Sequence, residues 1–104
     1  MPRFDVYRND DKQENKRIPF YLDVQNDHIQ GLESRVVVPL ISAVLFSQKM
    51  EDLHPEFEVE GQRVVMLTPG LGSVPKSLLC RPVAHLSSQQ LVIQNAIDTL
   101  FGSY

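Results

Sequence analysis

Val36-Val37-Val38-Pro39-Leu40-Ile41 is the stretch that decides the fold. It is a run of β-branched and aliphatic side chains in which no polar residue alternates with the apolar ones. Such a run is typical of a strand buried on both faces. Pro39 has no N–H to donate, so we expect the hydrogen-bond ladder to break or to reach an edge at that residue. The chain should therefore be organised around one central strand.

Two shorter strands are expected ahead of this stretch. Residues 20–25, FYLDVQ, alternate so that the apolar side chains face one way and the polar ones, including Asp23 and Gln25, face the other. That period predicts a half-buried strand. Residues 4–7, FDVY, read as a first strand. The all-polar segment 8–17 between them should be the solvated tip of a hairpin.

The chain after the central stretch predicts a second hairpin. Residues 57–68 contain Glu60-Gly61, where a two-residue turn would place glycine at positive φ. Segment 42–50 is weakly patterned and fits either a bent strand or a short helical turn. Residues 77–84 are apolar enough for one last short strand.

The end of the chain predicts a helix over residues 88–101. Apolar residues recur at intervals of three and four, as on one helical face: Ile93, Ala96, Ile97 and Leu100. Ser87 and Gln90 have the spacing of a capping box, and Gly102 is a natural residue just beyond the helix. Short strands closed by one helix indicate a single α+β domain over residues 1–104, with an antiparallel, barrel-like sheet.

The composition limits the classes of function. The chain has 104 residues, enough for one domain with a small core, so a dimer that buries more apolar surface is expected. The net charge is −3, whereas a nucleic-acid-binding domain usually has a cluster of lysine and arginine residues and a positive charge. Cys80 is the only cysteine and is expected to be a small buried hydrophobe. No apolar run approaches the roughly 20 residues of a membrane span, and we expect a cytoplasmic protein.

Motifs for chemistry are scarce in this sequence. His28, His54 and His85 have no second histidine or cysteine at metal-ligand spacing, so no metal is expected. Gly70-Leu71-Gly72 lacks the context of a phosphate loop and is better explained by a turn. We therefore expect no catalytic centre and no cofactor.

The C-terminus places two aromatic residues within four residues of the chain end. Phe101 and Tyr104 should either dock, on the sheet or across a dimer seam, or be kept for a partner. The sequence leaves both options open.

Several short segments, none diagnostic alone, have the order and spacing of one known family. They are FDVY (4–7), LDVQND (22–27), VVVPL (36–40), LT (67–68), SVP (73–75), VAHLS (83–87) and QNAID (94–98). By these segments the chain resembles the CcdB family over nearly its whole length. The resemblance implies a small antiparallel sheet or SH3-like barrel of the CcdB, Kid and MazF type, with a C-terminal α-helix.

The resemblance also implies a function. CcdB proteins are homodimeric toxins of plasmid or chromosomal toxin–antitoxin modules, and they serve plasmid maintenance. They bind the A subunit of DNA gyrase and trap the enzyme on cleaved DNA. A cognate CcdA-like antitoxin neutralises the toxin, and the complex represses its own operon. The antitoxin supplies the DNA-binding domain, so no direct DNA contact by this chain is expected.

The gyrase-binding positions of the family fall on a loop and on the chain end. Carried over by alignment they are His28, Ile29, Asp98, Phe101, Gly102, Ser103 and Tyr104. The best-known members have isoleucine at His28, asparagine at Asp98 and Trp-Gly-Ile in place of the last three residues. Loss of a tryptophan anchor should weaken gyrase binding unless the ring of Phe101 or Tyr104 substitutes. Asp98 would favour a basic partner surface.

Three alternatives follow from these departures. The chain could be a CcdB-fold toxin with altered or lost gyrase binding, or a decayed toxin that still binds an antitoxin. It could also be an mRNA endoribonuclease of the MazF or Kid kind, with Arg35, Arg63 or Arg81 as candidates in a groove. The gyrase hypothesis further requires that the bend near Ile29 and the last helical turn lie close together.

Overall fold

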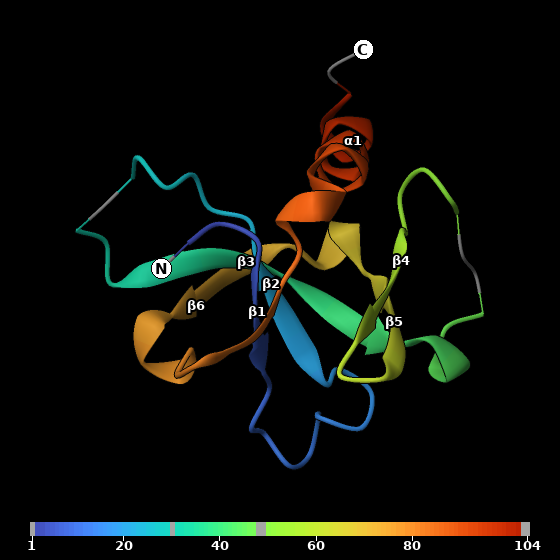
Figure 1. The fold of residues 1–104 in the computed structure, drawn as a ribbon, viewed down its shortest axis with the longest axis horizontal. Helices are drawn as coiled ribbons and strands as arrows, with labels where there is room; N and C mark the ends of the chain where they lie inside the picture. Colours follow the sequence, from blue (N-terminus) through green and yellow to red (C-terminus); the bar gives the residue numbers. More distant parts are fainter. Residues whose placement is uncertain (1, 30, 48–49, 103–104) are drawn as a thin grey trace.

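The strands of the computed structural model form one antiparallel sheet that curls into a half-barrel, with a single helix packed on it (Figure 1). The structure describes residues 2–29, 31–47 and 50–102. Its strands are β1 (Asp5–Arg8), β2 (Phe20–Asp23), β3 (Ser34–Ser42), β4 (Glu56–Val59), β5 (Gln62–Met66), β6 (Gly72–Pro75) and β7 (Pro82–His85). The helix α1 covers Gln90–Phe101, and four short 3-10 turns are Ala43–Leu45, Thr68–Gly70, Lys76–Leu78 and Ser87–Gln89. The expected α+β class with a barrel-like antiparallel sheet is confirmed.

The central strand β3 changes partner at Pro39, as its missing N–H requires. One side of β3 pairs with β2, and the other side pairs first with β6 and then with β5. The β6 ladder covers residues 34–37 and the β5 ladder covers residues 40–42. Pro39 therefore lies between the two ladders, where no strand N–H is needed.

Helix α1 covers the main hydrophobic core with the face that the sequence predicts. Ile93 and Ala96 are fully buried, and Ile97 packs against the same core. Gly102 has φ 70° and its N–H donates to the Asp98 carbonyl at 2.9 Å, so it ends the helix as expected. The predicted capping box is wrong, because Ser87 belongs to a 3-10 turn and α1 starts only at Gln90, without a side-chain cap.

The β4–β5 hairpin forms the predicted two-residue turn. Glu60 has φ 50° and Gly61 has φ 77°, the pair of positive values that a type I′ turn needs. The β1–β2 hairpin is also confirmed. Segment 42–50 contains a 3-10 turn, which was one of its two options.

The strand predicted over residues 20–25 ends at Asp23, and the polar residues Asp23 and Gln25 are buried, which corrects the expected half-buried strand. Asp23 is 0% exposed and Gln25 is 7% exposed. A second small cluster of Tyr7, Val37 and Leu79 covers this side of the sheet. Leu79 rather than the neighbouring Cys80 fills it, so the prediction of a buried Cys80 is wrong and its side chain is exposed.

The strand content near the end of the chain also differs from expectation. Strand β6 replaces part of a predicted turn, and the strand predicted over residues 77–84 starts only at Pro82. Within the described ranges, no helix is long and apolar enough to cross a membrane.

Candidate protein-binding site

The β2–β3 loop, which follows Asp23 and ends at Ser34, carries the first candidate residues. The Asn26 side chain accepts a hydrogen bond from the His28 N–H at 2.9 Å, and the Ile29 N–H donates to the Asn26 carbonyl at 3.1 Å. An asparagine that bonds its own backbone two residues ahead is a common way to start a turn. This turn leaves His28 exposed and Ile29 48% exposed.

A buried ion pair between Asp23 and Arg35 lies at the base of the β2–β3 loop. Arg35 donates from Nε to Asp23 Oδ2 at 2.8 Å and from Nη2 to Asp23 Oδ1 at 2.9 Å. The Gln25 side-chain oxygen accepts from the Val36 N–H at 3.0 Å. Bidentate geometry and neighbouring hydrogen bonds are what such a pair needs to offset the loss of hydration. Asp23 at the end of β2 and Gln25 in the loop therefore anchor the loop from inside the molecule and do not face water.

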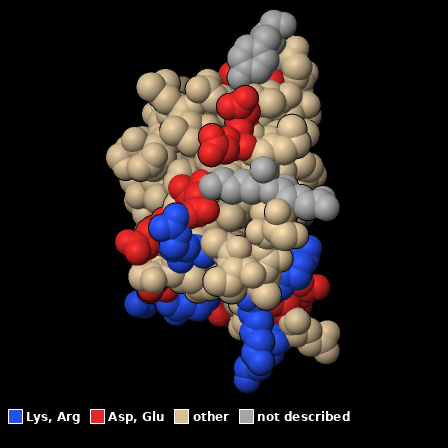
Figure 2. Space-filling model, turned by 90° about the vertical axis from the view of Figure 1, so that its right-hand side faces the viewer, with Lys and Arg blue, Asp and Glu red and all other residues tan. Residues whose placement is uncertain are grey.

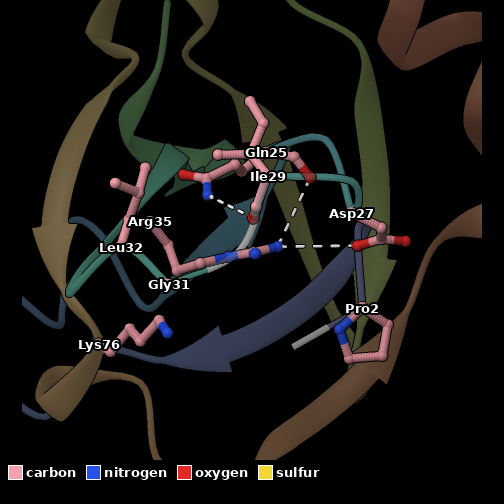
Figure 3. A pocket seen from close by; sticks show the side chains of 8 residues that line it. All are labelled: Pro2, Gln25, Asp27, Ile29, Gly31, Leu32, Arg35 and Lys76. Carbon is pink, nitrogen blue, oxygen red and sulfur yellow. Dashed lines mark hydrogen bonds and ion pairs between the residues drawn. The ribbon is translucent and has the colours of Figure 1, made fainter.

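A pocket of about 320 Å³ opens beside this ion pair. Figure 3 shows Ile29, Gly31 and Leu32 of the loop around it, with Arg35 reaching across its base. Pro2 and Lys76 complete the rim. The exposed apolar loop residues thus border a hollow in which Arg35 lies 3.8 Å from the Asp27 carboxylate.

Arg3 joins the β2–β3 loop to helix α1. Its N–H donates to Asp27 Oδ1 at 2.7 Å, its Nε to the Val24 carbonyl at 3.0 Å, and its Nη2 to Gln94 Oε1 at 3.0 Å. Its guanidinium also lies 4.8 Å from the centre of the Phe4 ring. Figure 1 shows the loop and α1 both extending to the upper side of the molecule. Arg3 therefore connects the start of the loop to the helix through both its backbone and its side chain.

The link continues along α1 to a candidate position. Gln94 donates from Nε2 to Asp98 Oδ1 at 3.1 Å, one turn further along the helix. Phe101 lies beyond Asp98 on the last turn and is 65% exposed, so its ring does not dock on the sheet of this chain. Gly102 follows as the residue that ends the helix, and the predicted positions Ser103 and Tyr104 lie outside the described residues.

Sequence reasoning missed Arg3, although the contacts of this residue span the candidate site. Arg3 precedes β1 and belongs to no alternating or helical pattern, and its partners are 21 and 91 residues away in sequence. Only the packing of the curled sheet brings these segments together. Asp23 and Arg35 were also missed as a pair, because their separation of 12 residues depends on the β2–β3 register.

His54 and His85 have structural partners. His54 Nδ1 accepts the Met50 N–H at 3.0 Å, and His85 Nδ1 lies 2.6 Å from Asp5 Oδ1. In the described part of the chain, no group of three histidine, cysteine, aspartate or glutamate residues could hold a metal ion. Burial raises the pKa of Tyr7, and the Asp5 and Asp23 carboxylates raise it further.

The arginines proposed for an endoribonuclease do not share a pocket. Arg35 is buried and bound to Asp23, beside the β2–β3 loop. Arg63 forms an exposed ion pair with Glu56 and lines a different pocket. Arg81 is exposed between Cys80 and β7.

The fold and these contacts define a class: a small α+β domain in which Arg3 connects the start of the β2–β3 loop to helix α1. The family model described as CcdB protein matches residues 3–102 of the 104-residue chain. The chain belongs to the CcdB family, which confirms the resemblance read from its sequence. Its members are toxins of toxin–antitoxin systems.

Proposed function

We propose that this chain binds the A subunit of DNA gyrase and traps the enzyme on cleaved DNA. The contact is made by a loop–helix surface, which we define as His28 and Ile29 of the β2–β3 loop with Asp98 and Phe101 of α1. The observation that carries the proposal is the Arg3 link, which holds the loop to the Gln94–Asp98 side of the helix. The proposal involves no bond chemistry by the toxin itself.

The loop–helix surface has the properties of a binding site for a large protein. Ile29 and Phe101 are exposed apolar side chains of the kind that anchor interfaces. Because Arg3 fixes their supports in advance, less conformational entropy is lost on binding. Asp98 adds a carboxylate at the same end of α1, which favours a basic patch on gyrase.

Plasmid cleavage tests this function. Purified protein with gyrase, ATP and supercoiled plasmid should give linear DNA after denaturation of the trapped complex. Phe101→Ala should reduce the linear product, whereas Leu78→Ala should not, because Leu78 has a similar exposure of 62% but lies on a different turn. Absence of cleavage together with absence of binding to the gyrase A subunit would reject the proposal.

We also propose that the protein acts as a cytoplasmic homodimer that a CcdA-like antitoxin neutralises, and that the complex represses its own operon. Exposed apolar residues on the first turn of α1, Leu91 at 79% and Val92 at 45%, support a further protein contact. Sedimentation of the free protein should give twice the monomer mass. Co-expression with the adjacent antitoxin reading frame should restore growth, and growth arrest in its presence would contradict neutralisation.

A further inference from the structure

The curled sheet is left open along a seam between its first and last strands. The strand order is β4-β5-β3-β2-β1-β7, so β4 and β7 are the two ends of the path. Among the described residues, no strand pairs with the outer side of β4. An edge of this kind presents a row of backbone N–H and C=O groups to any extended chain that reaches it.

The geometry of the β4–β5 hairpin shows which backbone groups face outward. A two-residue turn makes Val59 and Gln62 a hydrogen-bonded pair, and such pairs alternate along an antiparallel ladder. The Met66 N–H donates to the Pro55 carbonyl at 2.8 Å, which fits that alternation four residues from the turn. The backbone N–H and C=O of Glu58 therefore point away from β5, into the seam.

The seam is hollow where these groups point. A pocket of about 400 Å³ is lined by residues of the β4–β5 hairpin and of the segment before α1: Glu56, Phe57, Glu58, Arg63, Leu86, Ser88 and Gln89. Phe57 is 7% exposed and Leu86 packs against the main core, so these two side chains supply the apolar part of the lining. A strand placed here would bond β4 along its backbone and cover this apolar lining with alternate side chains.

The charged side chains near the edge of β4 indicate which kind of strand could pair with it. Glu58 is exposed and lies opposite Arg63 of β5, whose guanidinium forms an ion pair with Glu56. Acidic side chains also lie on the upper half of the face that carries β4 and β5, above a basic one (Figure 2). A second copy of β4 in antiparallel pairing would set glutamates against glutamates, and like charges directly opposite are destabilising. A lysine or arginine in the same place would be stabilising.

We propose that the outer edge of β4 receives an extended segment of a partner protein in which apolar and basic residues alternate. Its backbone pairs with Glu58, a basic side chain lies beside the Glu58 carboxylate, and an apolar side chain covers Phe57 and Leu86. This strand-addition site is separate from the loop–helix surface, so it does not depend on gyrase binding.

Amide hydrogen exchange with synthetic peptides tests the site. The probe is a blocked peptide of alternating lysine and valine, and the matched controls are its glutamate–valine counterpart and an N-methylated lysine–valine peptide that cannot complete the ladder. The lysine–valine peptide should slow exchange of the Glu58 amide, and the two controls should not. E58K should weaken binding of the lysine–valine peptide about three- to tenfold, because it replaces a favourable cross-strand Glu–Lys pair by a repulsive Lys–Lys pair. Glu33→Lys, an exposed acid before β3, should leave binding unchanged.

Two results would overturn the proposal. The first is unchanged exchange at Glu58 with a saturating concentration of the lysine–valine peptide, or equal protection by the glutamate–valine peptide. The second is protection of Glu58 that grows with protein concentration in the absence of peptide, because a second copy would then be the occupant.

Discussion

Replacing Arg3 by methionine removes the side chain that joins the β2–β3 loop to α1. The hydrogen bonds from Nε to the Val24 carbonyl and from Nη2 to Gln94 are lost, and so is the contact with the Phe4 ring. The backbone N–H of residue 3 can still donate to Asp27, and methionine retains most of the aliphatic stem. The substitution therefore isolates the guanidinium.

The expected cost follows from these contacts. Each lost hydrogen bond contributes about 1 kcal/mol at a partly buried site, and the cation–π contact adds about 0.5 kcal/mol. The free energy of unfolding should fall by about 2.5 kcal/mol, which lowers Tm by roughly 10–20 °C in a domain of this size. Part of this loss should make the loop more mobile in the folded protein, and binding must then order the loop again. If that ordering costs half of the lost free energy, gyrase binding weakens about tenfold.

Thermal unfolding and titration with the gyrase A subunit measure the two effects. Arg8→Met is the matched control, because Arg8 makes an exposed ion pair with Glu60 that is worth about 0–1 kcal/mol. This role of Arg3 is refuted if R3M lowers Tm no further than R8M and binds gyrase as tightly as the unsubstituted protein.

Three further outcomes are expected. Arg35→Met leaves the Asp23 carboxylate buried without its cation and should cost about 3–5 kcal/mol in urea unfolding; a second change, Asp23→Asn, should recover part of that loss, and additive costs would contradict the ion-pair account. Phe101→Ala should change the free energy of unfolding by less than about 0.5 kcal/mol while it reduces plasmid cleavage, and a large loss of stability would show a docked ring. Because burial raises the pKa of Tyr7, folding favours its neutral form, so this contribution to stability is complete below about pH 10 and is lost as pH rises through the folded pKa. Urea unfolding across this range should show the decline, and Tyr7→Phe should reduce it.

The main elements of the fold could be predicted because local patterns determine them. Each of three elements is determined by residues close together in the sequence: the apolar run around Pro39, the Glu60-Gly61 turn, and the helix with Ile93 and Ala96 on its buried face. Strand β6 could not be predicted in this way, because it is short and forms only where β3 offers a free edge.

The support of the candidate site depends on contacts between distant segments. The alternation of residues 20–25 predicts a solvent-facing Asp23, but this side chain is fully buried and pairs with Arg35. Arg3 gave no signal at all, since its partners come from the β2–β3 loop and α1. Family alignment could identify exposed positions such as Ile29, but not the side chains that brace them.

Hydrogen exchange of this chain in complex with the gyrase A subunit tests the central claim most directly. We expect slowed exchange in the β2–β3 loop and in the last turn of α1, with both segments protected at the same gyrase concentration. Protection confined to other segments, such as the β4–β5 hairpin or the Lys76–Leu78 turn, with the loop and the helix end unchanged, would contradict it.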